Sequence, residues 1–340
     1  MENNVLKSRR YYAVLLCAVV ALVVFFFSNK RKRYYNESGT VWTTEYHISY
    51  ESKDNLKDSI EAVLERIDRS VSVFNSESLL SKLNANKTTE ADEFFVRLYD
   101  TSHEVFNGSG GAFDPTVMPL VNAWGFGYKT GRLPEKAQID SILKFVGMDK
   151  TKLEGKTLVK NDGRTMFDFS SIAKGMACDE VGRMLARNGV ENYMVEIGGE
   201  VACRGVNYRG GEWHVSVDMP IENDTVVTHS SALVVALDSG GVATSGNYRN
   251  YKVVDGQKIA HIINPATGYP QMTNLLSATI MAPSCMLADA WATACMAMGT
   301  ERVKKIMEHD KHLGVMTISS DKDGNMVVWS NKAFADRVVR

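Results

Sequence analysis

A continuous apolar run near the start of the chain, Tyr11 to Phe27, most constrains how this protein can fold. A run of about 17 apolar residues is the short end of what crosses a bilayer core as a helix, and it is longer than many signal-peptide cores. Basic residues flank it on both sides, so charge counting leaves its orientation open. No small-x-small cleavage site follows it. We therefore predict an uncleaved transmembrane signal anchor over residues 11–28.

Cys17 lies within this run and has two interpretations. A cysteine near a signal segment can mark a lipoprotein, but Leu16 before it is larger than such a site usually tolerates. A simple apolar cysteine in a membrane segment is the favoured interpretation. The other cysteines fit no Cys-x-x-Cys metal or redox pattern, so they do not identify the compartment.

The rest of the chain has an ordinary globular composition, with 44% hydrophobic and 23% charged residues. A net charge of −1 removes any global electrostatic case for nucleic-acid binding. No repeat or long Pro/Ser-rich spacer divides the chain after Gly39, which favours a single domain of two lobes. The predicted organisation is a basic tail (1–10), the anchor (11–28), a juxtamembrane linker (29–38) and the main domain (39–340).

Apolar residues at three- and four-residue spacing predict several helices. In the segment Asp54–Phe74 they form one apolar stripe. Further helices are expected over Glu93–Phe106, from Pro134 to near Gly147, over Ile172–Asn188 and over Ser284–Met298.

Strands are expected mainly in the second half of the chain. The predicted strands are Tyr193–Ile197, Trp213–Asp218, Ala232–Leu237, Ser277–Met281 and Leu313–Ser319, the last in a hairpin with Met326–Trp329. Helices early and strands late favour an α+β fold, with largely antiparallel or mixed sheets flanked by helices, over a doubly wound sheet.

A glycine-rich stretch from Gly110 to Thr116 leads into a second one that ends at Gly127. Glycine lets the backbone approach a ligand closely, and Phe113, Trp124 and Phe126 offer flat apolar surface. These features suit a planar aromatic cofactor. The alternative is a Gly-Pro turn beside an aromatic core cluster.

The stretch Phe167–Gly175 predicts the end of a strand followed by a helix that Ser170 or Ser171 caps. Free amides at such a helix start form an anion site. Lys174 in the first turn is unfavourable for the helix dipole unless an anion such as a phosphate is present. An exposed lysine that is tolerated at small cost is the alternative.

His261 follows a predicted strand and could place its imidazole at the strand end, beyond the glycine-rich segment Gly240–Arg249. A lone histidine is more often a structural hydrogen-bonding group than a catalyst. The other histidines show no ligand spacing, which argues against a zinc site.

Asp289 and Thr293 lie four residues apart in an apolar, alanine-rich helix, so both project from one face. A carboxylate and a hydroxyl are hard oxygen ligands that suit Mg²⁺. The alternative is that Thr293 bonds a helix carbonyl while Asp289 is capped locally.

In this order, the stretches resemble the ApbE family, the FAD:protein FMN transferases, from about Gly39 to about Val339. The early segments Asp68–Asn75 and Ser81–Asn84 also fit the family. Its motifs appear as Gly-Ala-Phe-Asp-Pro-Thr-Val (111–117), Trp-Gly-Phe-Gly (124–127), Ile-Ala-Lys-Gly (172–175), Glu-Ile-Gly-Gly-Glu (196–200), Ala-Thr-Ser-Gly (243–246), His-Ile-Ile-Asn-Pro-Ala-Thr-Gly (261–268) and Ala-Asp-Ala-Trp-Ala-Thr (288–293).

The resemblance implies roles for matched positions. Phe74 would lie against the isoalloxazine, where the family commonly has a tyrosine. The other residues implied to line the FAD site are Ala112, Phe113, Asp114, Ser170, Lys174, Met176 and Ile263. The implied Mg²⁺ ligands are Asp289, Thr293 and the backbone carbonyls of Ala173 and Ala292. The chain departs from the family pattern at Phe74, at Ser170-Ser171, and at Asn247 and Asn264, where many members have aspartate.

The resemblance also implies the reaction. A threonine or serine hydroxyl of an acceptor protein would attack the FMN phosphorus of FAD, and AMP would leave. Asp289 would act through the metal, and His261, near the pyrophosphate, is the candidate for proton removal. Asp114 and Asp179 are the alternatives to His261 as the base.

Acceptors in this family belong to membrane redox complexes and carry a Ser/Thr-Gly-Ala-Thr-like site. The anchor would then hold the catalytic domain on the extracytoplasmic (periplasmic) side of the cytoplasmic (inner) membrane. Two other functions stay open: an FAD pyrophosphatase that releases FMN and AMP, and a non-enzymatic flavin-binding protein. A purely structural membrane protein is the least specific alternative.

Overall fold

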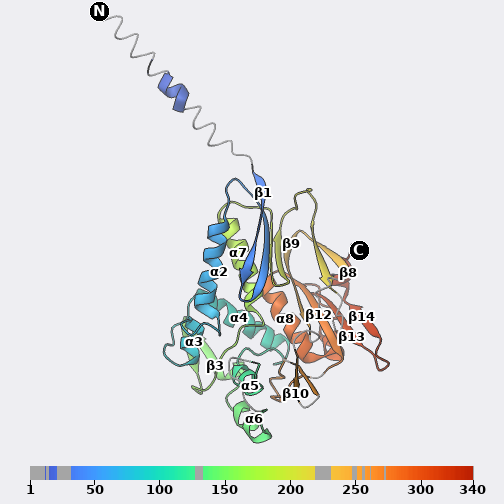
Figure 1. Cartoon of the computed structure of the whole chain (residues 1–340). Coiled ribbons are helices and arrows are strands. Elements are labelled where there is room, and N and C mark those ends of the chain that lie inside the picture. The colour runs from blue at the N-terminus through green and yellow to red at the C-terminus, as the bar shows by residue number, and fades with distance from the viewer. Residues whose placement is uncertain are drawn as a thin grey trace, which may run out of the picture.

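A computed structural model describes residues 12, 15–20, 32–126, 133–218, 231–246, 251–254, 257–260, 262–271 and 273–339. Its centre is an eight-stranded sheet with the strand order β1-β2-β5-β6-β9-β12-β13-β14, in which neighbouring strands are antiparallel (Figure 1). The strands are β1 (Arg33–Val41), β2 (Thr44–Ser52), β5 (Tyr193–Ile197), β6 (Glu200–Arg204), β9 (Ser239–Gly246), β12 (Leu275–Ala282), β13 (Gly314–Ser320) and β14 (Met326–Ser330).

Helices cover one face of this sheet and pack on it through the main hydrophobic core (Figure 1). They are α2 (Lys57–Val71), α4 (Glu93–Gly108), α7 (Ala173–Arg187) and α8 (Cys285–Met298). The pleat of β9 separates the two faces: Ala243 belongs to the main core, whereas its neighbour Val242 belongs to a second cluster.

The second cluster lies on the opposite face of the sheet. A hairpin of β7 (Trp213–Asp218) and β8 (Ser231–Leu237), together with α10 (Lys332–Ala335), covers that face. Trp213 and Phe334 pack there against apolar side chains of β6, β9, β12 and β13. The central sheet is therefore buried on both sides, which explains why its inner strands are apolar on both faces.

A third, smaller group of apolar residues forms what we call the satellite cluster: Leu120, Ile139, Val146 and Ile263. It joins α5 (Met118–Ala123) and α6 (Lys136–Leu143) to the segment that contains Ile263. The remaining elements are α3 (Leu79–Asn84), a 3₁₀ helix (Met148–Lys150), β3 (Thr151–Glu154), β4 (Thr157–Lys160), β10 (Tyr251–Val254), β11 (Gln257–Ala260) and α9 (Thr300–Met307).

The predicted α+β class and the largely antiparallel sheet are confirmed. Each predicted helix is present, although the one expected from Pro134 begins at Lys136 and ends at Leu143. The predicted strands are present within two residues at each end, and β13 and β14 form the expected pair.

The strand end predicted at Phe167 and Phe169 is wrong, because the structure assigns no strand to these residues. Both rings pack on Phe95, with centroids 5.6 and 5.4 Å away. Asn84 takes the place of a neighbouring strand: its side chain donates to the Phe167 carbonyl and accepts from the Phe167 amide, each at 2.8 Å. The alternation of Phe167 and Phe169 with Asp168 therefore reflects the burial of two aromatic rings and not the pairing of a strand.

The predicted linker, residues 29–38, is also partly wrong, because β1 begins at Arg33 and pairs with β2 along its whole length. Its two tyrosines are consecutive and therefore face opposite sides of the sheet. Tyr35 stacks on Tyr50 at 5.4 Å between ring centroids, whereas Tyr34 meets Trp213 at 6.3 Å. The catalytic fold therefore starts earlier than the predicted boundary at residue 39.

The tail (1–10) and most of the predicted anchor (11–28) lie outside the described residues; within the anchor the structure describes residues 12 and 15–20. Across the described part of the chain, no helix is both long and apolar enough to cross a membrane.

Candidate functional site

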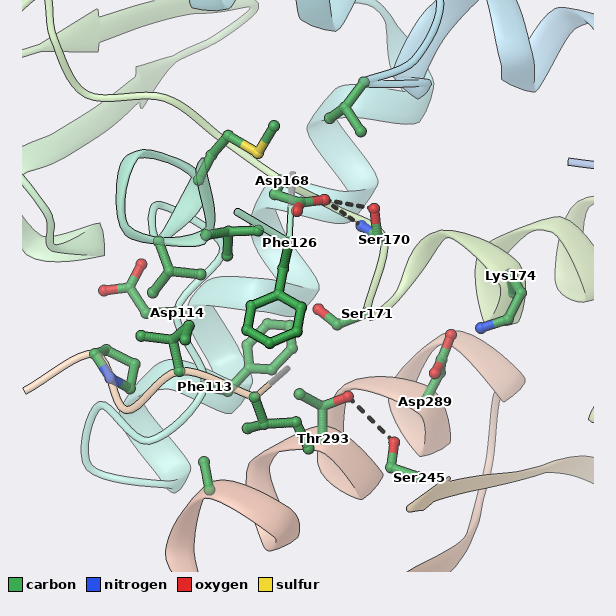
Figure 2. Close-up of a pocket in the computed structure, with 18 of the residues that line it drawn as sticks. Phe113, Asp114, Phe126, Asp168, Ser170, Ser171, Lys174, Ser245, Asp289 and Thr293 are labelled. Carbon is green, nitrogen blue, oxygen red and sulfur yellow. Dashed lines mark hydrogen bonds between the residues drawn. The ribbon is translucent and has the colours of Figure 1, made fainter. Parts of the chain in front are cut away.

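A cavity of about 750 Å³ opens where α7, α8, the end of β9 and the segment that follows α4 converge (Figure 2). This volume lies in the range of sites that bury organic cofactors. Phe113 and Phe126 lie on one side of it in Figure 2, and together with Phe74 of the same lining they form what we call the aromatic wall. Lys174 and Asp289 lie on the other side, and together with Glu200, the ion-pair partner of Lys174, they form what we call the charged cluster.

The structure brings most of the predicted site residues together at this cavity. Its lining includes Phe74, Ala112, Phe113, Asp114, Ser170, Lys174, Ile263, Asp289 and Thr293. Met176 does not line it, because its side chain is fully buried in the main core. Ala173 and Ala292 are not among the lining residues either. His261 and Asn247 lie outside the described residues.

The aromatic wall combines a buried and an exposed ring. Phe113 is buried, and its amide donates to Ser109 Oγ at 3.1 Å, which fixes the start of this segment. Phe74 is 76% exposed, an unusual state for a large apolar side chain that lines a cavity. A ring held at the mouth of a cavity offers a flat apolar surface to a planar ligand.

Asp114 lines the cavity, but its carboxylate already has protein partners. The amide and hydroxyl of Thr116 donate to Oδ1 at 2.8 and 2.6 Å, and the Met148 amide donates to Oδ2 at 3.0 Å. Burial raises the pKa of Asp114, and these hydrogen bonds act against that rise. With both oxygens occupied, Asp114 serves mainly to shape the turn that leads into α5.

The helix cap predicted at Ser170 or Ser171 is wrong. The residue before α7 is Ile172, which makes no side-chain cap, and both the amide and hydroxyl of Ser170 donate to Asp168, at 2.8 and 2.6 Å. The Gly175 amide in the first turn of α7 donates instead to Asp289 Oδ2 at 3.0 Å. A carboxylate from α8 thus takes the favourable position at the positive end of α7.

Lys174 is not the isolated exposed lysine of the alternative interpretation, because its Nζ lies 2.9 Å from Glu200 Oε1. In Figure 2 its side chain points toward Asp289. Burial alone would lower the pKa of Lys174, but the carboxylates of Asp289 and Glu200 raise it above its usual value. Lys174 therefore stays charged and partly neutralises two buried acids.

Glu200 is a site residue that the sequence reasoning did not single out, although it ends the Glu-Ile-Gly-Gly-Glu motif. Burial and the Asp289 carboxylate raise its pKa to about 8, against the effect of Lys174. Its Oε2 is buried and has no hydrogen-bond partner among the described residues. An acid directly after a Gly-Gly turn, at the start of an apolar strand, was the available sequence signal.

Asp289 and Thr293 lie one turn apart on α8 and both face the cavity, as their spacing predicted. Neither of the alternative local bonds is present: Asp289 accepts from α7, and Thr293 Oγ1 lies 3.3 Å from Ser245 Oγ on β9. Burial raises the pKa of Asp289, and Lys174 opposes that rise.

The donors at this end of the cavity fit a hard cation. Asp289 and Glu200 together with one lysine leave a net negative charge when all are ionised, and the free Oε2 of Glu200 and the Thr293 hydroxyl are hard oxygen donors. Within the described ranges, no three His, Cys, Asp or Glu side chains are grouped to hold a metal by themselves. Such a donor set matches Mg²⁺, which commonly binds one or two carboxylates and completes its shell with water and substrate phosphates.

Asp179, the other predicted alternative base, does not line the cavity. Its two oxygens accept the amides of Cys285 and Met286, at 3.0 and 2.9 Å. Burial raises the pKa of Asp179 to about 6, and these two hydrogen bonds oppose the rise. Asp179 therefore caps the start of α8, the helix that carries Asp289.

Replacing Asp179 with alanine is expected to lower the free energy of unfolding by about 1–2 kcal/mol, because two buried helix-terminal amides lose their acceptors. Urea denaturation followed by circular dichroism measures this. Asp140→Ala is the matched control: Asp140 makes an exposed pair with Lys136 at 2.6 Å, and its loss should cost less than about 0.5 kcal/mol. Equal losses in the two variants would contradict the capping role.

Two glycines of the predicted ligand-binding stretches turn out to pack against protein backbone. A Cβ on Gly175 would lie 2.5 Å from the Cys285 carbonyl oxygen, and a Cβ on Gly241 would lie 2.3 Å from Cys285 Cα. The start of α8 is therefore wedged between α7 and β9, with glycine on each side. Close approach of the start of α8 explains both glycines.

Comparison with known proteins gives a consistent result. The profile of the ApbE family matches residues 39–317. A Vibrio cholerae protein named FAD:protein FMN transferase is 34% identical over 295 residues, which cover 84% of this chain and 87% of the relative. An Escherichia coli protein of the same name is 30% identical over 311 residues, covering 88% and 87%.

Solved structures agree with the sequence relatives. The flavin transferase ApbE from Vibrio cholerae aligns with a TM-score of 0.79 at 30% identity, over 90% of this chain and 99% of that one. The apo form of Pseudomonas stutzeri flavinyl transferase ApbE aligns with a TM-score of 0.80 at 29% identity, over 90% and 97%. The chain therefore belongs to the ApbE family.

Proposed function

We propose that this protein transfers FMN from FAD to a threonine or serine hydroxyl of an acceptor protein and releases AMP. The observation that carries the proposal is one cavity that is lined both by the aromatic wall and by the charged cluster with Thr293. That arrangement suits a ligand with a planar ring system and a pyrophosphate. The relatives named FAD:protein FMN transferase support the same reaction.

The proposed metal is Mg²⁺, held by Asp289 and Thr293, with the backbone carbonyls of Ala173 and Ala292 as the further ligands predicted from sequence. Glu200, through its free Oε2, is a donor available at the same end of the cavity. When bound, the metal would neutralise charge on the phosphate oxygens.

The protein's own residues then have distinct tasks. Hydrogen bonding to Gly175 holds Asp289 in one orientation, and Lys174 supplies a permanent positive charge where the pyrophosphate would lie. His261 stays our predicted base for the acceptor hydroxyl. Both alternatives are less suited to that task, because the carboxylates of Asp114 and Asp179 already accept hydrogen bonds on each oxygen.

The location and partners are part of the proposal. Residues 11–28 would anchor the chain in the cytoplasmic (inner) membrane, with the catalytic domain on the extracytoplasmic side. The acceptors would be proteins of membrane redox complexes that carry a Ser/Thr-Gly-Ala-Thr-like site. The uninterrupted apolar run Tyr11–Phe27 supports the anchor.

The test is to incubate residues 29–340, which keep β1 complete, with FAD, Mg²⁺ and a candidate acceptor domain, and to read intact masses. We expect the acceptor to gain the mass of one FMN while AMP appears. Chelation of the metal with EDTA should abolish both signals, and added Mg²⁺ should restore them.

Other outcomes would replace the proposal. Release of FMN and AMP while each of several acceptor domains stays unmodified would favour the pyrophosphatase. FAD that binds but stays intact with Mg²⁺ present would favour a flavin-binding protein.

A further inference from the structure

Arg302, a residue of α9, reaches across to the segment that follows α4. Its Nη2 donates to the carbonyls of Ser109, in a short contact, and of Gly110, at 3.3 Å. The residues it joins are about 190 positions apart in the sequence. A guanidinium that bonds backbone carbonyls fixes main chain rather than another side chain, and charge-assisted hydrogen bonds of this kind are stronger than neutral ones.

The segment that Arg302 holds leads directly into the aromatic wall. Ser109 is fully buried, and its Oγ accepts the amide of Phe113 at 3.1 Å. Gly110 and Gly111 have φ angles of +58° and +80°, so the chain turns sharply between Ser109 and the cavity. Ala112 and Phe113, which follow the turn, both line the cavity. The position of Phe113 therefore depends on where Ser109 and Gly110 are held.

The same region also touches the helix of the charged cluster. A Cβ on Gly108 would lie 2.9 Å from the ring of Trp291 on α8, so the end of α4 is in close contact with that helix. α9 follows α8 directly, through Gly299. The helices that carry Asp289, Thr293 and Arg302 thus hold the base of the aromatic wall at two points, Gly108 and Ser109–Gly110.

We infer that Arg302 is a positioning residue that sets Phe113, the buried ring of the aromatic wall, at a fixed distance from Asp289 and Thr293, and thereby sets the affinity for FAD. The inference rests on the proposed function, because it takes FAD as the ligand of the cavity. Arg302 does not line the cavity. It acts through the backbone of the turn, so its loss should weaken the binding of FAD more than it slows FMN transfer once FAD is bound.

The test compares the full chain with Arg302→Met, which keeps much of the side-chain length but removes every donor. We expect the Kd for FAD, from flavin fluorescence, and the KM for FAD to rise about tenfold, with kcat at saturating FAD changed less than about twofold. Arg302→Lys, which keeps a charged donor, should restore most of the affinity. Lys305→Gln, a charge change on the same helix, is the control and should leave Kd, KM and kcat unchanged.

A second arm separates positioning from general stabilisation. A Cβ on Gly110 would lie 2.7 Å from Arg302 Nη2, so Gly110→Ala should displace the guanidinium as well as strain the turn. If both residues act on the same contact, the double variant Gly110→Ala/Arg302→Met should weaken FAD binding by less than the product of the two single effects. If Arg302→Met does not fold, Gly110→Ala alone decides the question: it should raise the Kd and KM for FAD with kcat nearly unchanged, and unchanged FAD affinity in that variant would overturn the inference.

Three results would overturn the inference: unchanged FAD affinity in Arg302→Met, a fall in kcat with KM unchanged, or single effects that multiply fully. Failure of the proposed function looks different. In that case the unaltered protein itself would leave every acceptor domain unmodified in the presence of FAD and Mg²⁺, whatever residue stands at position 302.

Discussion

Asp289→Asn should lower kcat for FMN transfer by about a thousandfold or more, which corresponds to about 4 kcal/mol of transition-state stabilisation. Asparagine has nearly the same shape, and its carbonyl oxygen can still accept the Gly175 amide that Asp289 Oδ2 accepts at 3.0 Å. The fold should therefore persist while the negative charge is lost. The measurement is AMP release and acceptor mass gain at saturating FAD, over a Mg²⁺ titration.

Asp323→Asn is the matched control, because Asp323 is an exposed aspartate in the turn between β13 and β14. It should retain full activity and the same Mg²⁺ dependence. A rate for Asp289→Asn above a tenth of the original, with an unchanged Mg²⁺ requirement, would remove Asp289 from the metal site and weaken the proposed mechanism.

Gly175→Ala should lower the free energy of unfolding by about 3 kcal/mol, since the added methyl group overpacks a close helix contact. The new Cβ would lie 2.5 Å from the Cys285 carbonyl oxygen and 2.8 Å from Asp289 Cβ. The carbonyl belongs to the backbone of α8, so no rotamer change can move it away. Denaturant unfolding should show a lower midpoint with an unchanged slope.

Gly211→Ala is the companion measurement. There the nearest atom to a new Cβ is Asn207 Nδ2 at 3.9 Å, an ordinary contact, so the change should stay within about 0.5 kcal/mol. Similar midpoints for the two alanine variants would show that α7 and α8 can move apart at little cost. That result would contradict the importance of the close packing around Cys285.

The elements whose formation depends on residues close together in the sequence were predictable. The apolar stripe of α2 and the cap of α8, where Ser284 Oγ accepts the Leu287 amide at 3.3 Å, depend only on nearby residues. Strand order was not predictable, because the pairing of β6 with β9 and of β9 with β12 joins distant segments. β1 was missed because most of its residues are polar and its two tyrosines, which face opposite sides of the sheet, are consecutive and give no alternating apolar pattern.

The site was predictable where spacing along one helix decides geometry, as for Asp289 and Thr293. Glu200 was not, because it meets Lys174 only when β6 is placed beside α7. The packing role of Gly175 was not predicted for a related reason. A sequence shows that the backbone must come close to something at a glycine, but not whether that neighbour is a ligand or another helix.

The satellite cluster has a consequence for how members of such a family can diverge. Val121, Phe126 and Ile263 line the cavity, yet Ile263 belongs to this cluster and Val121 and Phe126 pack against it, and none of the three belongs to the main core. Substitutions that change which flavin nucleotide is bound can therefore accumulate there without disturbing the close packing of α7, α8 and β9 that holds the charged cluster. Selection for a modified flavin should find its tolerated substitutions at Val121, Phe126 and Ile263, while α7 and α8 stay nearly invariant.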